Sequence, residues 1–220
     1  ADFAYTMDGD TEGEIQYENF NAADAIFEIQ GVNVHPGSAK DVMVNAALVA
    51  MEINAALPCG ETPADTEDYE GFYHLVSMSG DVACAKLHYI VRDHDADKFA
   101  ARLETLKEIS KQMNLKWGFG TVKLTIDEQY RNMAEIIEDG NMHLIENAKK
   151  ACAAADVTPL ILPIRGGTDG ARLSFMGLPC PNLGTGGHGY HGPFEHITAE
   201  GMDKAVDVMI ELVKLYAEMK

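Results

Sequence analysis

The most constraining feature of this sequence is a regular succession of strand-like and helix-like segments between residues 21 and 132. The strand-like segments alternate apolar and polar side chains, whereas the helix-like ones repeat apolar residues every three or four positions. In chain order they are a strand at 22–32, a helix at 41–57, strands at 72–78 and 82–91, a helix at 95–115 and a strand at 122–126. This β-α-β-β-α-β order predicts one module of the split βαβ, or ferredoxin-like, type.

The sequence on either side of this module has a different character. Residues 133–155 and 198–219 have helical patterns, and a Gly-rich stretch of loops and short elements lies between them. The simplest architecture is an inserted domain, in which the module at 21–132 interrupts a host domain made from residues 1–20 and 133–220. We therefore predict an α/β fold with an α+β insert.

The host domain is expected to be incomplete. The chain lacks an initiator Met, and Ala1–Tyr5 has the pattern of the middle of an apolar strand, so we expect the chain to begin inside a larger protein. A function that depends on the host domain would then need further sequence.

The charge of the chain excludes two classes of partner. Its 220 residues include 17 Lys and Arg against 35 Asp and Glu, which gives a formal net charge of −18. Such a surface repels phosphate backbones and anionic membranes, because nucleic-acid binding draws most of its affinity from Lys and Arg. With 46% hydrophobic residues the chain can still bury packed cores. We expect a soluble globular protein that binds neither nucleic acid nor membranes.

The sequence also indicates a cellular location. The apolar stretch at 42–57 is interrupted by Asn45, Glu52 and Asn54, so it falls short of the roughly 20 apolar residues that a membrane span needs. No charged-then-apolar signal segment is evident. The four cysteines lack CxxC spacing, which favours reduced thiols and predicts a cytoplasmic protein.

Two glycine-rich motifs near the C-terminus could carry chemistry. Arg165 precedes a glycine turn and an apparent helix start, where backbone N–H groups and the guanidinium would suit a carboxylate or phosphate. The alternative is a structural turn with Arg165 in a salt bridge. Residues 186–196 contain three of the eight histidines, including His191. Neutral imidazole is a good zinc ligand, so this segment is either a metal-binding loop or a polar surface loop.

Four further polar residues lie near the ends of predicted elements. Asp8 could ligate zinc or form an ordinary Asp-Gly turn. His35, held by Pro36, could donate to a developing oxyanion or cap the following helix. Arg92 is either a paired strand arginine or a clamp for a substrate carboxylate, and Asn132 is either a hinge turn or an amide that binds the substrate backbone.

Several motifs, found in order along the whole chain, resemble the peptidase T family. The longest are Tyr-Glu-Gly-Phe-Tyr-His-Leu at 69–75 and Ile-Arg-Gly-Gly-Thr-Asp-Gly at 164–170, with shorter ones at 4–9, 33–37 and 130–133. This family comprises tripeptide aminopeptidases that belong to the co-catalytic dinuclear zinc peptidases. The resemblance implies an enzyme with an α/β zinc-binding body and a smaller ferredoxin-like lid.

The resemblance also implies a role for each candidate residue. Asp8 and His191 would each be a ligand of one of two zinc ions, which share an activated water. His35 on the lid would stabilise the tetrahedral oxyanion. The residues that would hold the peptide backbone or its C-terminal carboxylate are Arg92, Asn132 and Arg165. The implied substrates are tripeptides, from which the N-terminal residue is released.

The remaining metal ligands and the general-base glutamate of this family lie upstream of the point where the chain starts. The resemblance therefore implies the C-terminal part of the enzyme, inactive by itself. Because His35 lies on the lid and the zinc ions on the body, catalysis would require lid closure or donation from a neighbouring subunit. We expect a hinge near Phe20 and Asn132.

Two alternatives remain open. A β-α-β-β-α-β module leaves edge strands that can pair between subunits, so the chain could be a non-catalytic module that forms a homodimer. The parent protein could also be a related zinc deacylase or carboxypeptidase of the same family.

Overall fold

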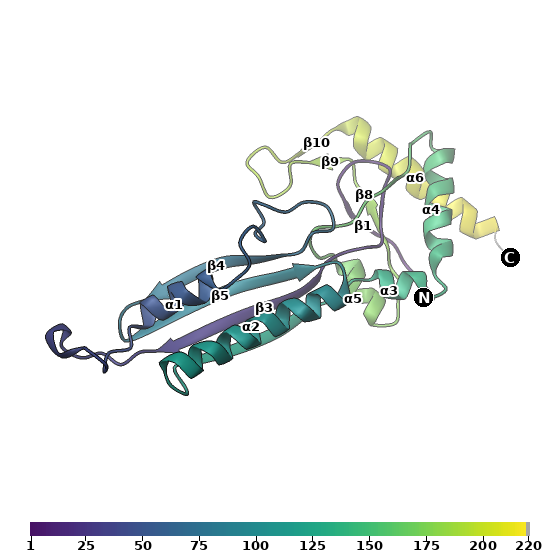
Figure 1. Ribbon diagram of the computed structural model, residues 1–220. Helices are drawn as coiled ribbons and strands as arrows, with labels where there is room; N and C mark the ends of the chain where they lie inside the picture. Colours follow the sequence, from purple (N-terminus) through teal and green to yellow (C-terminus); the bar gives the residue numbers. More distant parts are fainter. Residues whose placement is uncertain (219–220) are drawn as a thin grey trace. The chain divides into compact units, whose positions relative to one another are not determined.

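The chain divides into two units in the computed structural model, which describes residues 1–218 (Figure 1). Unit 1 comprises Ala1–Phe20 and Arg131–Lys220, and unit 2 comprises Asn21–Tyr130. The backbone thus passes from one unit to the other twice, after Phe20 and after Tyr130, as it does around an inserted domain. No helix within residues 1–218 combines the length and the apolar character needed to cross a bilayer.

Unit 2 is a mixed α/β structure with one four-stranded sheet. Its elements are β3 (Asn21–Gln30), the 3-10 helix η1 (Pro36–Ser38), α1 (Ala46–Ala55), β4 (Phe72–Gly80), β5 (Cys84–Asp93), α2 (Ala96–Trp117) and β6 (Val122–Tyr130). The strands lie in the order β4-β5-β3-β6, and every neighbouring pair is antiparallel. The predicted sequence of strands and helices is therefore present.

The core of unit 2 follows from the alternation along its two central strands. In β3 and β5 every second side chain is buried against α1 and α2; these side chains are Ala23, Ala25, Phe27, Ile29, Ala85, Leu87, Tyr89 and Val91. The intervening side chains lie on the opposite face of the sheet, because successive residues of a strand point to opposite sides. Arg92, which sequence analysis singled out, belongs to that second face.

The first helix is shorter than its sequence pattern predicts. Val44 forms an isolated antiparallel bridge with Val32, which holds the chain extended just before α1. Asn45 then caps the helix, since its side chain accepts hydrogen bonds from the N–H groups of Ala47 and Leu48. Asp41 has a φ of 61°, which is incompatible with a right-handed helix. The predicted helix start at residue 41 is therefore wrong.

Unit 1 contains a four-stranded sheet, a short hairpin and four helices within the part of the chain that the structure describes. The sheet has the order β1 (Thr6–Gly9), β8 (Asn182–Gly184), β2 (Glu14–Gln16) and β7 (Leu160–Ile161). The hairpin consists of β9 (Gly187–His188) and β10 (His196–Ile197). The helices are α3 (Ala134–Glu138), α4 (Met142–Ala154), α5 (Asp169–Phe175) and α6 (Ala199–Glu218). In Figure 1, α4 and α6 lie side by side.

Two sequence predictions for unit 1 need correction. The first strand begins at Thr6, so Ala1–Tyr5 is not the middle of a strand. The helix predicted over 133–155 is divided into α3 and α4. Gly140 has a φ of 83°, a left-handed conformation that ends a helix at little cost only when the residue lacks a Cβ.

Candidate functional site

Asp8 occupies the end of β1, where the backbone is fixed and the side chain is exposed. The Asp8 N–H donates a 2.9 Å hydrogen bond to Oδ1 of Asn182, which lies on the parallel neighbour β8. Asn182 is buried, and its Nδ2 donates to Oε1 of Gln16 at 2.7 Å. These buried amides orient the backbone of Asp8, so its carboxylate is presented from a rigid strand rather than from a mobile loop.

His191 lies in the turn between β9 and β10 with an exposed side chain. Its φ of 59° falls in the left-handed region, which is uncommon for a residue with a Cβ and costs free energy. A hydrogen bond of 2.9 Å from the His191 N–H to Oε2 of Glu195 holds this conformation. Glu195 therefore supports the backbone of the turn that carries His191, and this role is not evident from the sequence pattern.

A hydrogen-bonded junction joins the His191 turn to the end of β1. The Tyr190 hydroxyl donates to the carbonyl oxygen of Gly9 at 3.2 Å, and Thr185 Oγ1 donates to the same carbonyl at 2.9 Å. The two hydroxyl oxygens are 2.6 Å apart. Since Gly9 follows Asp8 and Tyr190 precedes His191, this junction brings together the two segments that carry the candidate metal ligands.

Replacing Thr185 by valine is expected to loosen this junction. The substitution keeps the shape of the side chain but removes the hydroxyl that donates to Gly9 and accepts from the Gly187 N–H at 3.2 Å. A partly buried hydrogen bond of this kind contributes about 1–2 kcal/mol when its partners are left unsatisfied. We expect amide hydrogen exchange in residues 187–191 to become about 5–30-fold faster, as measured by mass spectrometry.

A matched control is available for this prediction on α2. Thr105→Val removes a hydroxyl that donates to the carbonyl of Ala101 within its own helix and belongs to unit 2 rather than to the Gly9 junction. Exchange in residues 187–191 should be unchanged by that substitution. Equal exchange in the wild type and in Thr185→Val would show that the hydroxyl does not hold the turn.

The donor chemistry of Asp8 and His191 fits part of a zinc site. A carboxylate oxygen and an imidazole nitrogen are both common zinc ligands. Among residues 1–218, no group of three or more His, Cys, Asp or Glu side chains could hold a metal ion. A zinc site that includes Asp8 and His191 would therefore need ligands from outside this part of the chain.

His35 is located in unit 2, where it precedes the short helix η1. Its Nδ1 accepts a 3.1 Å hydrogen bond from the Gly37 N–H, so a neutral ring carries its proton on Nε2. The side chain is exposed. The ring thus caps η1, while α1 is capped by Asn45 instead. The same geometry presents Nε2–H as a hydrogen-bond donor.

Arg92 is half-buried on the sheet face of unit 2 that is turned away from the helices. Its guanidinium donates to the carbonyl oxygens of Val91 at 3.0 Å and Ala23 at 3.4 Å, and it lies 5.3 Å from the ring centroid of Tyr130. Burial lowers the pKa of Arg92, although Tyr130 and Asp24 oppose this shift. Within residues 1–218 Arg92 forms no ion pair, in contrast to the paired alternative.

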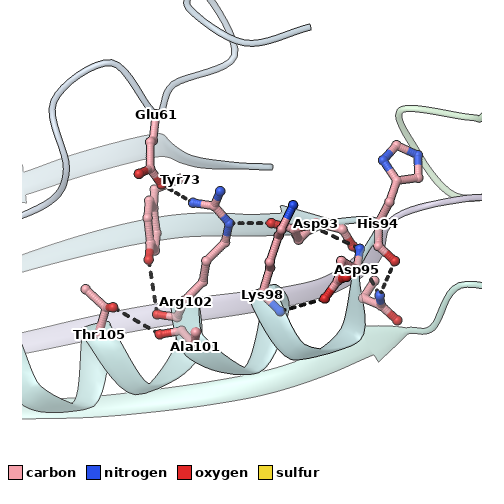
Figure 2. A network of polar contacts seen from close by, with 10 residues as sticks. Glu61, Tyr73, Asp93, His94, Asp95, Lys98, Ala101, Arg102 and Thr105 are labelled. Atoms are coloured by element: carbon pink, nitrogen blue, oxygen red, sulfur yellow. Dashed lines mark hydrogen bonds and ion pairs between the residues drawn. The ribbon is translucent and has the colours of Figure 1, made fainter. Parts of the chain in front are cut away.

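A polar network anchors the end of β5 next to Arg92 (Figure 2). Asp93 is 1% exposed, and its carboxylate accepts a 2.8 Å hydrogen bond from Nε of Arg102 on α2. Arg102 also pairs with Glu61, and its guanidinium lies 5.2 Å from the ring centroid of Tyr73. The network thereby ties the loop around Glu61 to the sheet.

Asn132 and Arg165 both belong to unit 1, whereas His35 belongs to unit 2. Oδ1 of Asn132 accepts hydrogen bonds of 3.0 Å from the N–H groups of Asn19 and Ala134, as expected for a residue that fixes a turn. The Arg165 guanidinium lies 5.2 Å from the ring centroid of Phe20. Asn132 and Arg165 therefore flank the two points where the chain leaves and re-enters unit 1.

The glycine motif after Arg165 leads into a helix, as predicted. Thr168 caps α5, since its hydroxyl accepts a hydrogen bond from the Gly170 N–H at 3.4 Å. Asp169 adds a negative charge to the first turn. The N-terminus of α5 thus has its own hydrogen-bond acceptor and its own carboxylate, and both stabilise the helix.

Comparisons with known proteins identify relatives of this chain. Residues 17–118 match the family model of the peptidase dimerisation domain. Over 218 residues the chain is 54% identical to peptidase T from Desulfitobacterium hafniense. The matched region covers 99% of this chain and 53% of that protein. This chain is similar to peptidase T along almost its whole length. It spans about half the length of the curated relatives it matches, and the resemblance inferred from its motifs is confirmed.

Solved structures share the mixed α/β fold along nearly the whole chain. Aminopeptidase PepT from Bacillus cereus has a TM-score of 0.84 at 23% identity, over 99% of this chain and 58% of that one. A tripeptidase from Staphylococcus aureus has a TM-score of 0.85 at 18% identity, over 99% and 57%. A dinuclear metal-binding peptidase of the M20 family from Bacillus subtilis has a TM-score of 0.68 at 15% identity, over 98% and 57%.

Proposed function

We propose that this peptidase T homologue is the C-terminal part of a zinc-dependent aminopeptidase that releases the N-terminal residue of tripeptides. The observation that carries the proposal is the junction of Tyr190, Thr185 and Gly9, which joins the segments of His191 and Asp8. The identity of 54% to a peptidase T supports the enzyme class, and a structural relative is named a tripeptidase.

In this proposal the two units have different roles. Unit 1, with residues 1–20 and 131–220, is part of the α/β zinc-binding body. Unit 2 is a ferredoxin-like lid that also forms a homodimer. The strand order β4-β5-β3-β6, with all pairs antiparallel, supports the ferredoxin-like assignment. The match of residues 17–118 to a peptidase dimerisation domain supports the homodimer, for which β4 and β6 offer edge strands.

The mechanism assigns a task to each residue of the chain. Asp8 and His191 would hold zinc together with ligands from the rest of the parent protein; zinc, when bound, supplies a water of lowered pKa. Nε2–H of His35 would donate to the developing oxyanion, as its tautomer allows. Arg92 and Arg165 would bind the C-terminal carboxylate of the substrate. Asn132 would bind the substrate backbone.

The proposed mechanism also requires that His35 be brought to the metal ligands. His35 belongs to unit 2, whereas Asp8 and His191 belong to unit 1. Either the units close on each other, or a neighbouring subunit supplies His35. The points at which the chain changes units, next to Phe20 and near Asn132, would act as the hinge.

A second candidate function is a non-catalytic dimerisation module, which the matched dimerisation domain favours. A third is a deacylase or carboxypeptidase of the same zinc family. Hydrolysis assays on the full-length parent, with tripeptides, dipeptides and N-acyl amino acids, separate the three. We expect zinc-dependent cleavage of tripeptides by the parent and no cleavage by this chain alone. A stable dimer whose parent cleaves none of these compounds would support the second candidate.

His35→Ala in the parent is expected to lower kcat for a tripeptide about 10²–10³-fold with little change in KM, because an oxyanion donor acts in the transition state. His74→Ala is a suitable control, since His74 is also an exposed histidine of unit 2. A fall in kcat of the same size in both variants, or in neither, would contradict the role of His35.

A further inference from the structure

Tyr130, the last residue of β6, lies on the same face of the sheet of unit 2 as Arg92. Both residues pair with Ala22 of the central strand β3, Arg92 from β5 and Tyr130 from β6. Paired residues of neighbouring strands share one face of a sheet. Ala22 is fully buried and has only a methyl side chain, so the two larger side chains meet above it. The guanidinium carbon of Arg92 is 5.3 Å from the ring centroid of Tyr130.

A β-bulge places Tyr130 at this position. From Val122 to Glu128, β6 pairs with β3 in one continuous register, which would put Gln129 opposite Ala22. The register shifts between Ala22 and Ala23, so Gln129 is the extra residue and Tyr130 lies opposite Ala22 instead. Strict alternation would have turned Tyr130 toward the helices. Bulges often redirect a side chain in this way next to a functional site.

The guanidinium of Arg92 is anchored through one of its nitrogens. Nη1 donates to the carbonyl oxygens of Val91 and Ala23. Neither Nε nor Nη2 forms an ion pair with a carboxylate of residues 1–218, and Asp24, on the same face, lies 3.6 Å from Nε2 of His88 instead. A planar guanidinium binds a carboxylate through two parallel hydrogen bonds, and a half-buried cation is stabilised by such a partner.

The Tyr130 ring restrains this guanidinium from the side of β6. A guanidinium within about 6 Å of an aromatic centroid is attracted to the face of the ring. Burial raises the pKa of Tyr130, whereas Arg92 lowers it, so the two side chains also interact electrostatically. A long side chain that is already held in one orientation loses less conformational entropy when it binds a ligand.

We propose that Tyr130 is a positioning residue for the binding of a peptide carboxylate by Arg92. The ring of Tyr130 and the carbonyl oxygens of Val91 and Ala23 hold the guanidinium in one orientation, which leaves Nε and Nη2 for the ligand. The inference rests on the proposed function in one respect, namely that Arg92 binds the C-terminal carboxylate of the substrate.

The full-length parent tests this inference with a tripeptide of alanine and its C-terminal amide. The ratio of kcat/KM for the acid to kcat/KM for the amide measures what the carboxylate contributes. We expect a ratio of about 10–100 in the wild type, because hydrogen bonds to a charged group are strong. Tyr130→Leu should lower the ratio about 5–30-fold, through the acid alone. Tyr130→Phe retains the ring and should keep the ratio within about twofold of the wild type.

A purely structural effect of Tyr130→Leu would lower kcat/KM for both peptides by the same factor, and this result would overturn the inference. Equal ratios in Tyr130→Leu and Tyr130→Phe would also overturn it. Thr125→Leu is the matched control, since Thr125 is exposed on the same face of β6, opposite Ile26. Its ratio should equal that of the wild type, and a ratio as low as that of Tyr130→Leu would show that the effect is not specific to Tyr130.

Nitrogen-15 relaxation of the Arg92 side chain gives a measurement that does not depend on hydrolysis. In this chain we expect the order parameter of the Nε–H bond to exceed about 0.8 in the wild type and to fall below about 0.6 in Tyr130→Leu. A wild-type value below about 0.6, or no change in Tyr130→Leu, would refute the positioning and leave the proposed function intact. A parent that cleaves the acid and the amide equally would instead refute the role of Arg92 in the proposed function, and with it the ligand named here.

Discussion

Replacing Arg102 by methionine is expected to lower the free energy of unfolding of unit 2 by about 3–5 kcal/mol. Asp93 is 1% exposed and pairs with Nε of Arg102 at 2.8 Å. Methionine fills similar space but leaves the Asp93 carboxylate without its cation, and an uncompensated buried charge is strongly destabilising. Loss of the Glu61 pair and of the contact with Tyr73 should also loosen the loop around Glu61.

Urea unfolding followed by tryptophan fluorescence measures this effect directly. The chain has one tryptophan, Trp117, which lies at the end of α2 and so reports on unit 2. Lys107→Met on the same helix is the control, because Lys107 forms an exposed ion pair with Glu104. Such pairs contribute little, so this variant should stay within about 0.5 kcal/mol of the wild type. A loss below about 1 kcal/mol in Arg102→Met would mean that Asp93 does not depend on Arg102.

The second large effect is expected from His191→Ala in the full-length parent. Removal of an imidazole ligand should reduce the zinc content by about one ion per chain and lower tripeptide hydrolysis by about 10³-fold or more, because a catalytic metal contributes several kcal/mol to the transition state. Asp8→Ala should act in the same way, since the junction through Tyr190 and Gly9 holds the two segments together. Elemental analysis by mass spectrometry and a peptidase assay measure both quantities.

His188→Ala is the matched control for this prediction. His188 lies in the same hairpin, where its ring is 5.4 Å from that of His196, and the proposed mechanism gives it no ligand role. We expect this variant to retain its zinc and most of its activity. A loss of zinc in His188→Ala together with full zinc content in His191→Ala would reverse the assignment of the ligand.

The fold of unit 2 could be predicted from the sequence because its signals are local. The alternation along β3 and the helical repeat of α2 each arise from side chains within a single element. The start of α1 could not be predicted in this way, because it depends on the bridge between Val44 and Val32, which the helical pattern does not reveal.

In the candidate site, too, some features follow from local sequence and others only from contacts between distant residues. The residue types alone indicated Asp8 and His191 as possible ligands, and the family resemblance gave them roles that remain proposals. The contacts that support them come from residues without a distinctive pattern, such as Thr185, Asn182 and Glu195. Sequence spacing does not identify such partners, because the Tyr190 hydroxyl and the Gly9 carbonyl are 181 positions apart in the chain.

By itself, the sequence determined the order of strands and helices, the insertion of one module into another and the kinship with peptidase T. These depend on periodicity and on short motifs, which are properties of neighbouring residues. The tertiary structure decided which polar groups support the backbone at His191 and Asp8, which carboxylate pairs with Arg102, and which face of α6 is buried. These depend on distances between residues far apart in the chain, and packing sets such distances only once the whole unit is folded.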